Sequence, residues 1–162
     1  MSHNEQAGLR FSLADLALGG CVMSETITLN TLGPHSPEYT REVAWAMAEC
    51  VRVLNYAAGS GAETAIVYPA TVYEVLGALY TATARMPQLL TQLNTWLERA
   101  AEAGNLADDR HRDPAAAVAG SREAVARAKL ALGSVTTALE TAQQEIAFLK
   151  AADGRENAGG HW

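Results

Sequence analysis

The feature that most constrains the fold is a heptad spacing of apolar positions that runs unbroken from Val72 to Ala100. Successive members are separated alternately by four and three residues, which places their side chains along one narrow stripe of an α-helix. A stripe of this length is typical of a helix that packs lengthwise against another helix. Its members are Val72, Leu76, Leu79, Thr83, Met86, Leu90, Leu93, Leu97 and Ala100.

Start and stop signals predict three helices, over residues 37–58, 69–103 and 114–152. Each begins with proline at its first position, and a serine or an aspartate suited to capping precedes the first and the last. Pro87 lies inside the heptad stripe, where proline removes one backbone hydrogen bond. Because the phase of the stripe is unchanged across Pro87, we expect a continuous, kinked helix rather than two separate helices.

The chain before the first helix has weaker patterns. A short apolar piece that contains Phe11, Leu13, Leu16 and Leu18 is expected to form a helical turn capped by Ser12. Residues 25–32 alternate in the manner of one short strand or an extended arm. A lone strand leaves its backbone groups unpaired, so this one needs another chain or stays irregular.

The expected organisation has three parts. Met23 opens a sequence typical of an alternative translation start, so the chain is expected to begin at either Met1 or Met23. The glycine-rich C-terminus has the composition of a disordered tail. The parts are an N-terminal extension over 1–35, a helical bundle over 36–152 and a tail over 153–162.

Composition agrees with a helical protein and disfavours several functions. Hydrophobic residues make up 49% of the 162 residues but aromatic residues only 6%, and alanine, the best helix former, accounts for much of the difference. The net charge of −6 makes nucleic acid an unlikely partner. No apolar stretch reaches the roughly 18 residues that a membrane-spanning helix needs. The two cysteines form no ligand pattern, and we predict a cytoplasmic protein with reduced thiols.

These observations predict an all-α fold, an elongated antiparallel helical hairpin or three-helix bundle with coiled-coil-like heptad seams. The first helix is shorter than the other two, so it covers only part of them and leaves an apolar seam outside. We expect a second copy of the chain or a helical protein partner to cover this seam, and the alternative is a monomer whose N-terminal segment folds over it. The predicted interaction seam consists of Leu90, Leu93, Leu97, Val118, Val125 and Ala128.

No residue pattern indicates catalysis, so we expect no catalytic, cofactor-binding or metal-binding residue. His111 lies among aspartates, but this segment lacks the helical ligand spacing of a carboxylate-bundle metal site. The glycines at 59 and 61 lack the lysine of a phosphate-binding loop and are interpreted as helix terminators. A non-enzymatic interaction or accessory protein is therefore the predicted function.

The alternative function is a nucleic-acid accessory or regulatory factor, related to mobile genetic elements. It depends on a local excess of positive charge between residues 110 and 129, although such a run is more typical of a solvated helix face. Its candidate phosphate contacts are Arg110, Arg112, Arg122, Arg127 and Lys129.

Three segments carry a family resemblance: the twelve residues from Tyr68 to Leu79, the alanine-rich start at Asp113, and the sequence Ala-Gln-Gln-Glu-Ile-Ala that begins at Ala142. In these segments the chain resembles a group of small helical proteins of high-GC actinobacteria, over residues 44–149. The group has no assigned activity, so the resemblance implies a helical fold and assigns no functional residue. It also supports a start near Met23.

Overall fold

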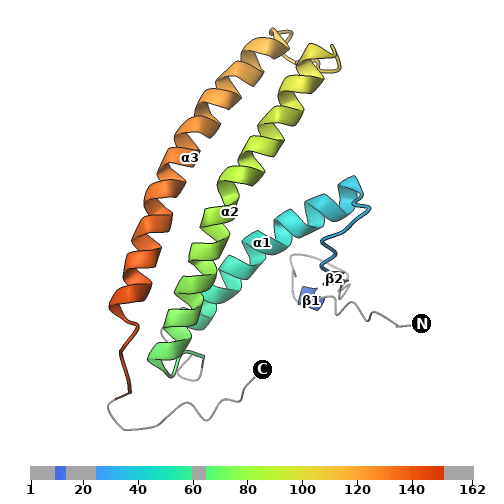
Figure 1. Ribbon diagram of the computed structural model, residues 1–162. Helices are drawn as coiled ribbons and strands as arrows, with labels where there is room; N and C mark the ends of the chain where they lie inside the picture. Colours follow the sequence, from blue (N-terminus) through green and yellow to red (C-terminus); the bar gives the residue numbers. More distant parts are fainter. Residues whose placement is uncertain (1–9, 14–24, 60–64, 152–162) are drawn as a thin grey trace, which may run out of the picture. The chain divides into compact units, whose positions relative to one another are not determined.

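The computed structural model describes residues 10–13, 25–59 and 65–151. Its elements are the strands β1 (Arg10–Leu13) and β2 (Glu25–Thr28) and the helices α1 (Pro37–Ala58), α2 (Pro69–Glu102) and α3 (Pro114–Glu145) (Figure 1). Contacts divide the chain between Ala65 and Ile66 into two units, whereas the sequence predicts a boundary at residue 35, where the first strong helix signal begins. The predicted all-α class is confirmed, with one small strand pair added.

The N-terminal unit contains the strand pair. β1 and β2 are antiparallel, with Arg10 opposite Thr28 and Leu13 opposite Glu25. The expected helical turn around Phe11 is therefore wrong, because that segment is extended and supplies the backbone partner that β2 needs. The predicted positions Leu16 and Leu18, the alternative start at Met23 and the tail over 153–162 lie outside the described residues.

α1 begins and ends where the sequence predicts. The Oγ of Ser36 accepts a hydrogen bond from the Tyr39 backbone N–H at 3.1 Å, and Pro37 occupies the first turn. The Tyr39 hydroxyl accepts a hydrogen bond from the Asn30 backbone N–H at 2.8 Å, which ties the approach segment to the first turn of the helix. At the other end, the backbone N–H of Gly59 donates to Tyr56 O at 3.3 Å.

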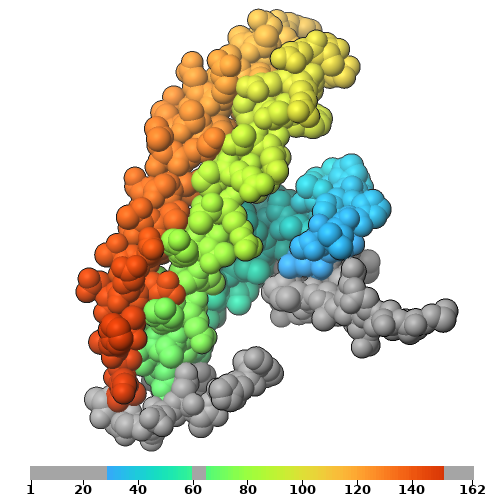
Figure 2. Space-filling view, viewed as in Figure 1, coloured from blue at the N-terminus to red at the C-terminus, as the bar shows by residue number. Residues whose placement is uncertain are grey.

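The C-terminal unit is a helical hairpin, in which α2 and α3 run antiparallel and contact each other along their lengths (Figures 1 and 2). α2 is continuous through Pro87, as predicted. It ends in a Schellman motif, since Gly104 N–H donates to Ala101 O and Asn105 N–H donates to Ala100 O. Gly104 has a φ of 69°, a backbone conformation that favours glycine.

α3 begins at the predicted cap but ends before Ala152. The Oδ1 of Asp113 accepts a hydrogen bond from the Ala115 N–H at 3.0 Å. The helix stops at Glu145, and Phe148 beyond it is 93% exposed. The expected end is wrong because the chain beyond Glu145 turns with i→i+3 hydrogen bonds: Ala147 N–H donates to Gln144 O at 3.2 Å, and Leu149 N–H donates to Ile146 O at 3.0 Å.

The surface of α2 that meets α3 differs in phase from the heptad stripe. Asn94 is 7% exposed, while Leu93, the heptad member beside it, is 54% exposed. A straight helix has 3.6 residues per turn, so a strict heptad stripe drifts by about 20° per repeat. After several repeats, the residue of α2 that is covered by α3 is the one that follows the heptad position. The covered positions in α3 follow the same drift and are Val118, Ser121, Val125, Lys129, Leu132, Thr136 and Leu139.

Candidate interaction face of the helical hairpin

An exposed row of large apolar side chains lies along the C-terminal half of α2. Leu89 is 47% exposed, Leu93 is 54% exposed and Trp96 is 64% exposed. The residue that follows each of them in the sequence is covered by α3; these residues are Leu90, Asn94 and Leu97. The row therefore lies beside the contact with α3, about 100° around the helix axis from it.

α3 carries a matching row of small residues. Ala117, Ala124, Ala128 and Ala131 are exposed, and each precedes a covered position of α3. In an antiparallel pair of helices, the residues that immediately precede the contact positions point to the same side of the hairpin from both helices. The two rows therefore share one side. We call this surface the apolar face and define it by Leu89, Leu93, Trp96, Ala117, Ala124, Ala128, Ala131 and Val135.

The opposite side of the hairpin is mostly polar. Lys129 donates a hydrogen bond from Nζ to Thr91 Oγ1 at 2.8 Å, and Gln88 and Arg122 are exposed on this side. Leu130 also lies on this side and is 77% exposed, with the small Ala126 one turn before it and Ser134 one turn after it. The hairpin is thus asymmetric: one face is apolar from Leu89 to Trp96, with Arg85 one turn before it, and the opposite face is polar.

The structure divides the six predicted seam residues into two groups. Leu93 and Ala128 lie on the apolar face, where both are exposed. Val118 is 8% exposed, and it lies between the helices with the half-buried residues Leu90, Leu97 and Val125. The expectation that all six are exposed on one face therefore differs from the structure, because α2 and α3 cover each other along this stretch. The drift of the contact leaves Leu93 and Ala128 outside it.

The five candidate phosphate contacts do not form one surface. Arg112 donates to Asp108 Oδ2 from Nε at 3.0 Å and from Nη2 at 2.8 Å. Lys129 is half-buried against α2, and Arg122 and Arg127 are five positions apart, which turns them about 140° from each other around the helix. Arg110 is exposed in the connecting loop.

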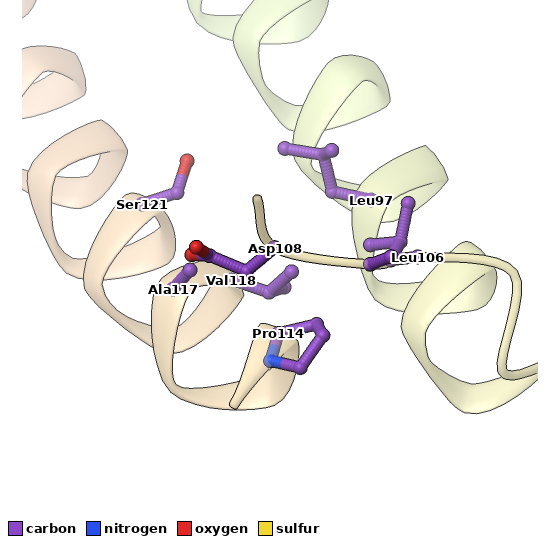
Figure 3. Close-up of a pocket in the computed structure, with 8 residues that line it drawn as sticks. Leu97, Leu106, Asp108, Pro114, Ala117, Val118 and Ser121 are labelled. Atoms are coloured by element: carbon purple, nitrogen blue, oxygen red, sulfur yellow. The ribbon is translucent and has the colours of Figure 1, made fainter. Parts of the chain in front are cut away.

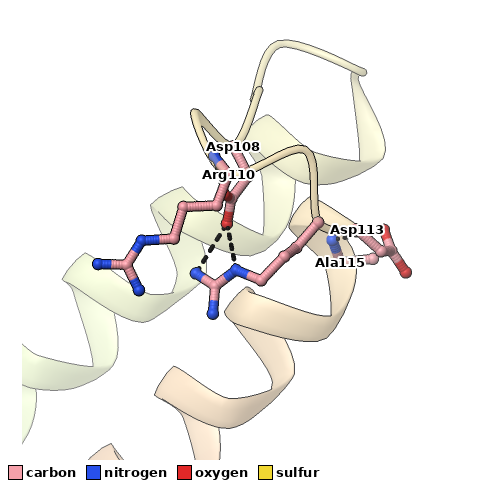
Figure 4. Close-up of polar contacts among 5 residues, drawn as sticks. Asp108, Arg110, Asp113 and Ala115 are labelled. Carbon is pink, nitrogen blue, oxygen red and sulfur yellow. Dashed lines mark hydrogen bonds and ion pairs between the residues drawn. The ribbon is translucent and has the colours of Figure 1, made fainter.

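The connection between α2 and α3 encloses a shallow cavity of about 240 Å³ (Figure 3). Asp108 is the charged residue of its lining, and both oxygens of this carboxylate accept hydrogen bonds. Oδ1 accepts from the Arg110 N–H at 2.7 Å, and Oδ2 accepts from the Arg112 guanidinium (Figure 4). The hydrogen bonds from Arg112 and then from the Arg110 backbone lower the pKa of Asp108. The lining consists of Leu97, Leu106, Ala107, Asp108, Pro114, Ala117, Val118 and Ser121.

The carboxylates around His111 hold the loop together. Asp108 binds Arg112, and Asp113 caps α3, so neither carboxylate is directed toward His111 by these contacts. Within residues 10–13, 25–59 and 65–151, no group of three potential metal ligands is present. Helices in the same ranges lack the combination of length and apolar character that crossing a membrane requires.

Sequence reasoning missed two features of the hairpin contact. Asn94 Nδ2 donates to Glu98 Oε1 at 2.9 Å, while Asn94 Oδ1 is buried and accepts no hydrogen bond. Gln143 Nε2 donates to the Tyr73 carbonyl oxygen at 3.1 Å and passes close to Gly77. The polar residue and the glycine are visible in the sequence, but only the register between the helices gives them these roles.

A scan against protein-family models gives no match to this chain, and searches of curated proteins and of solved structures give none. The geometry of the hairpin therefore provides the basis for a functional proposal.

Proposed function

We propose that the protein is a non-enzymatic helical interaction protein that self-associates through the apolar face of its hairpin. The observation that carries the proposal is the exposure of Leu89, Leu93 and Trp96 in one row, between 47% and 64%, beside the exposed alanines of α3. Burial of such side chains against a second copy would favour association by about 25 cal/mol for each Å² of apolar surface removed from water. A contiguous apolar face with no charged group at its centre is typical of a protein interaction site.

A nucleic-acid function has less support. The basic residues of the stretch from Arg110 to Lys129 point in different directions, and two of them are engaged by Asp108 and Thr91. A phosphate-binding surface needs several free cations side by side. Self-association is therefore the function that the geometry supports best.

The test compares two substitutions of the same chemistry on opposite sides of the hairpin. Leu93→Glu places a charge on the apolar face, and Leu130→Glu places one on the polar face, where leucine is even more exposed. The solution mass of the full chain is measured by light scattering over a range of concentrations, and far-UV circular dichroism records the helical content.

We expect the unchanged protein and the Leu130→Glu variant to have twice the mass of one chain. The Leu93→Glu variant should have the mass of a single chain at the same helical content, because an unpaired charge buried between apolar surfaces is costly. A single-chain mass for the unchanged protein at every concentration would overturn the proposal. An equal response of the two variants would overturn it as well.

A further inference from the structure

Building on the proposed self-association, we infer the pairing itself: two copies meet about a two-fold axis parallel to the helices, so that the large row of α2 packs on the partner's alanine row of α3. The result is a four-helix bundle in which every neighbouring pair of helices is antiparallel. Three properties of the apolar face support this arrangement: the sizes of its side chains, their levels along the hairpin and the placement of charge.

Side-chain size makes the apolar face complementary to itself. Its α2 half presents two leucines and a tryptophan, and its α3 half presents four alanines, with Val135 at the end of the row. A two-fold axis parallel to the helices exchanges the positions of α2 and α3, so each large row faces a small one. If α2 paired with the partner's α2 instead, large side chains would face large side chains. No large side chain would then pack on the alanine rows.

The levels of the two rows agree with this exchange. The side chain of Lys129 reaches Thr91, and that of Gln143 reaches Gly77 and the Tyr73 carbonyl. These contacts fix the register between α2 and α3 to within one helical turn. In this register Leu93 is level with the turn of α3 between Ala124 and Ala128. Rotation about an axis parallel to the helices leaves levels unchanged. Leu93 therefore meets the partner's Ala124 and the partner's Ala128.

Charge lies at the margins of the face: Arg85, one turn before Leu89, continues the row of α2, and Arg127 lies beside the row of α3. The centre holds no ionisable residue, so two copies of a protein with a net charge of −6 meet there without like-charge repulsion. At the edge, Trp96 is 64% exposed and Arg127 is exposed without an ion pair in the described chain. Side chains lean toward the N-terminus of their helix, which brings Trp96 and the partner's Arg127 toward each other in the pairing. A guanidinium beside an indole ring is attractive.

Interchain disulfide formation tests this pairing directly. Single-cysteine variants of the full chain are made in a Cys21→Ser, Cys50→Ser background, with Leu93→Cys in one and Ala124→Cys in the other. The two proteins are mixed, oxidised briefly, and separated without reductant. A 93-to-124 disulfide is expected in the mixture, and much slower formation of 93-to-93 and 124-to-124 disulfides is expected in the separate samples, since those positions lie diagonally across the bundle.

A second pair of variants checks the edge contact. Arg127→Glu is expected to weaken the dimer about five-fold, because each dimer contains two such contacts of about 0.5 kcal/mol. Arg122→Glu makes the same charge change on the polar face and should leave the dissociation constant unchanged.

The outcomes separate the pairing from the proposed function. A dimer that Leu93→Glu dissociates, but that forms 93-to-93 disulfides faster than 93-to-124 disulfides, would keep the proposed function and overturn this pairing. Equal weakening by Arg127→Glu and Arg122→Glu would overturn the edge contact. A single-chain mass for the unchanged protein would overturn both the proposed function and this pairing.

Discussion

Two adjacent rows of α2 differ in a way that hydrophobicity alone does not explain. The row that faces α3 includes Asn94, which is 7% exposed, and the next row holds Trp96, which is 64% exposed. A chain that buries an asparagine and leaves a tryptophan in water has not placed its most apolar row inside its own hairpin. Burial in α2 therefore follows position relative to α3 rather than hydrophobicity, and the second row is left exposed for the external contact that we propose.

The largest expected effect comes from a charge in the row that serves the fold. Val118→Asp should destabilise the hairpin by about 3 kcal/mol, because it places an unpaired carboxylate where valine is 8% exposed. The measurement is the free energy of unfolding in urea, taken at a fixed protein concentration so that the proposed self-association contributes equally.

Ala119→Asp is the matched control for this prediction. It introduces the same residue at the next position, which is exposed on the polar side. A loss of about 0.5 kcal/mol is expected from helix propensity alone. Equal losses for the two variants would show that position 118 is not enclosed by the hairpin and would remove the distinction between the two rows.

An intermediate effect of opposite sign is expected at Asn94. Asn94→Leu should stabilise the protein by about 1 kcal/mol, since it removes a buried acceptor, Oδ1, that has no hydrogen-bond partner in the described structure. Thermal unfolding followed by circular dichroism measures the change. Asn94→Asp should be destabilising, because it adds charge at the same buried site. A destabilised Asn94→Leu protein would show that the polar group supports the interior row.

Local signals predicted the ends of helices better than the contacts between them. The Ser36 and Asp113 caps and the glycine after α2 were readable because each acts within a few residues. The strand β1 was missed because its partner lies twelve or more residues away. The end of α3 was missed because the apolar pattern continues through Ile146 and Leu149, where the backbone changes to i→i+3 turns. The candidate site was predicted in part: Leu93 and Ala128 lie on the apolar face because the drift of a 3.6-residue helix takes them out of the contact, whereas Val118 stays between the helices.

The smallest effects compare one substitution at a crowded and an open position of the hairpin. A Cβ at Gly133 would have no heavy atom within 4 Å outside its own helix neighbourhood, so Gly133→Ala should stabilise the protein by about 0.8 kcal/mol through helix propensity. A Cβ at Gly77 would lie 2.5 Å from Gln143 Nε2. Gly77→Ala should therefore displace that amide, lose its bond to the Tyr73 carbonyl and give a net change near zero.

Combining Gly77→Ala with Gln143→Ala distinguishes the two contributions. The amide is then absent, so the alanine at 77 should stabilise this background by about 0.8 kcal/mol, as it does at Gly133. Urea unfolding of the four proteins of the cycle measures the coupling between positions 77 and 143. If Gly77→Ala stabilises the unchanged protein as much as the Gln143→Ala background, the two residues do not meet, and the register that places Leu93 level with Ala124 and Ala128 loses one of its two supports.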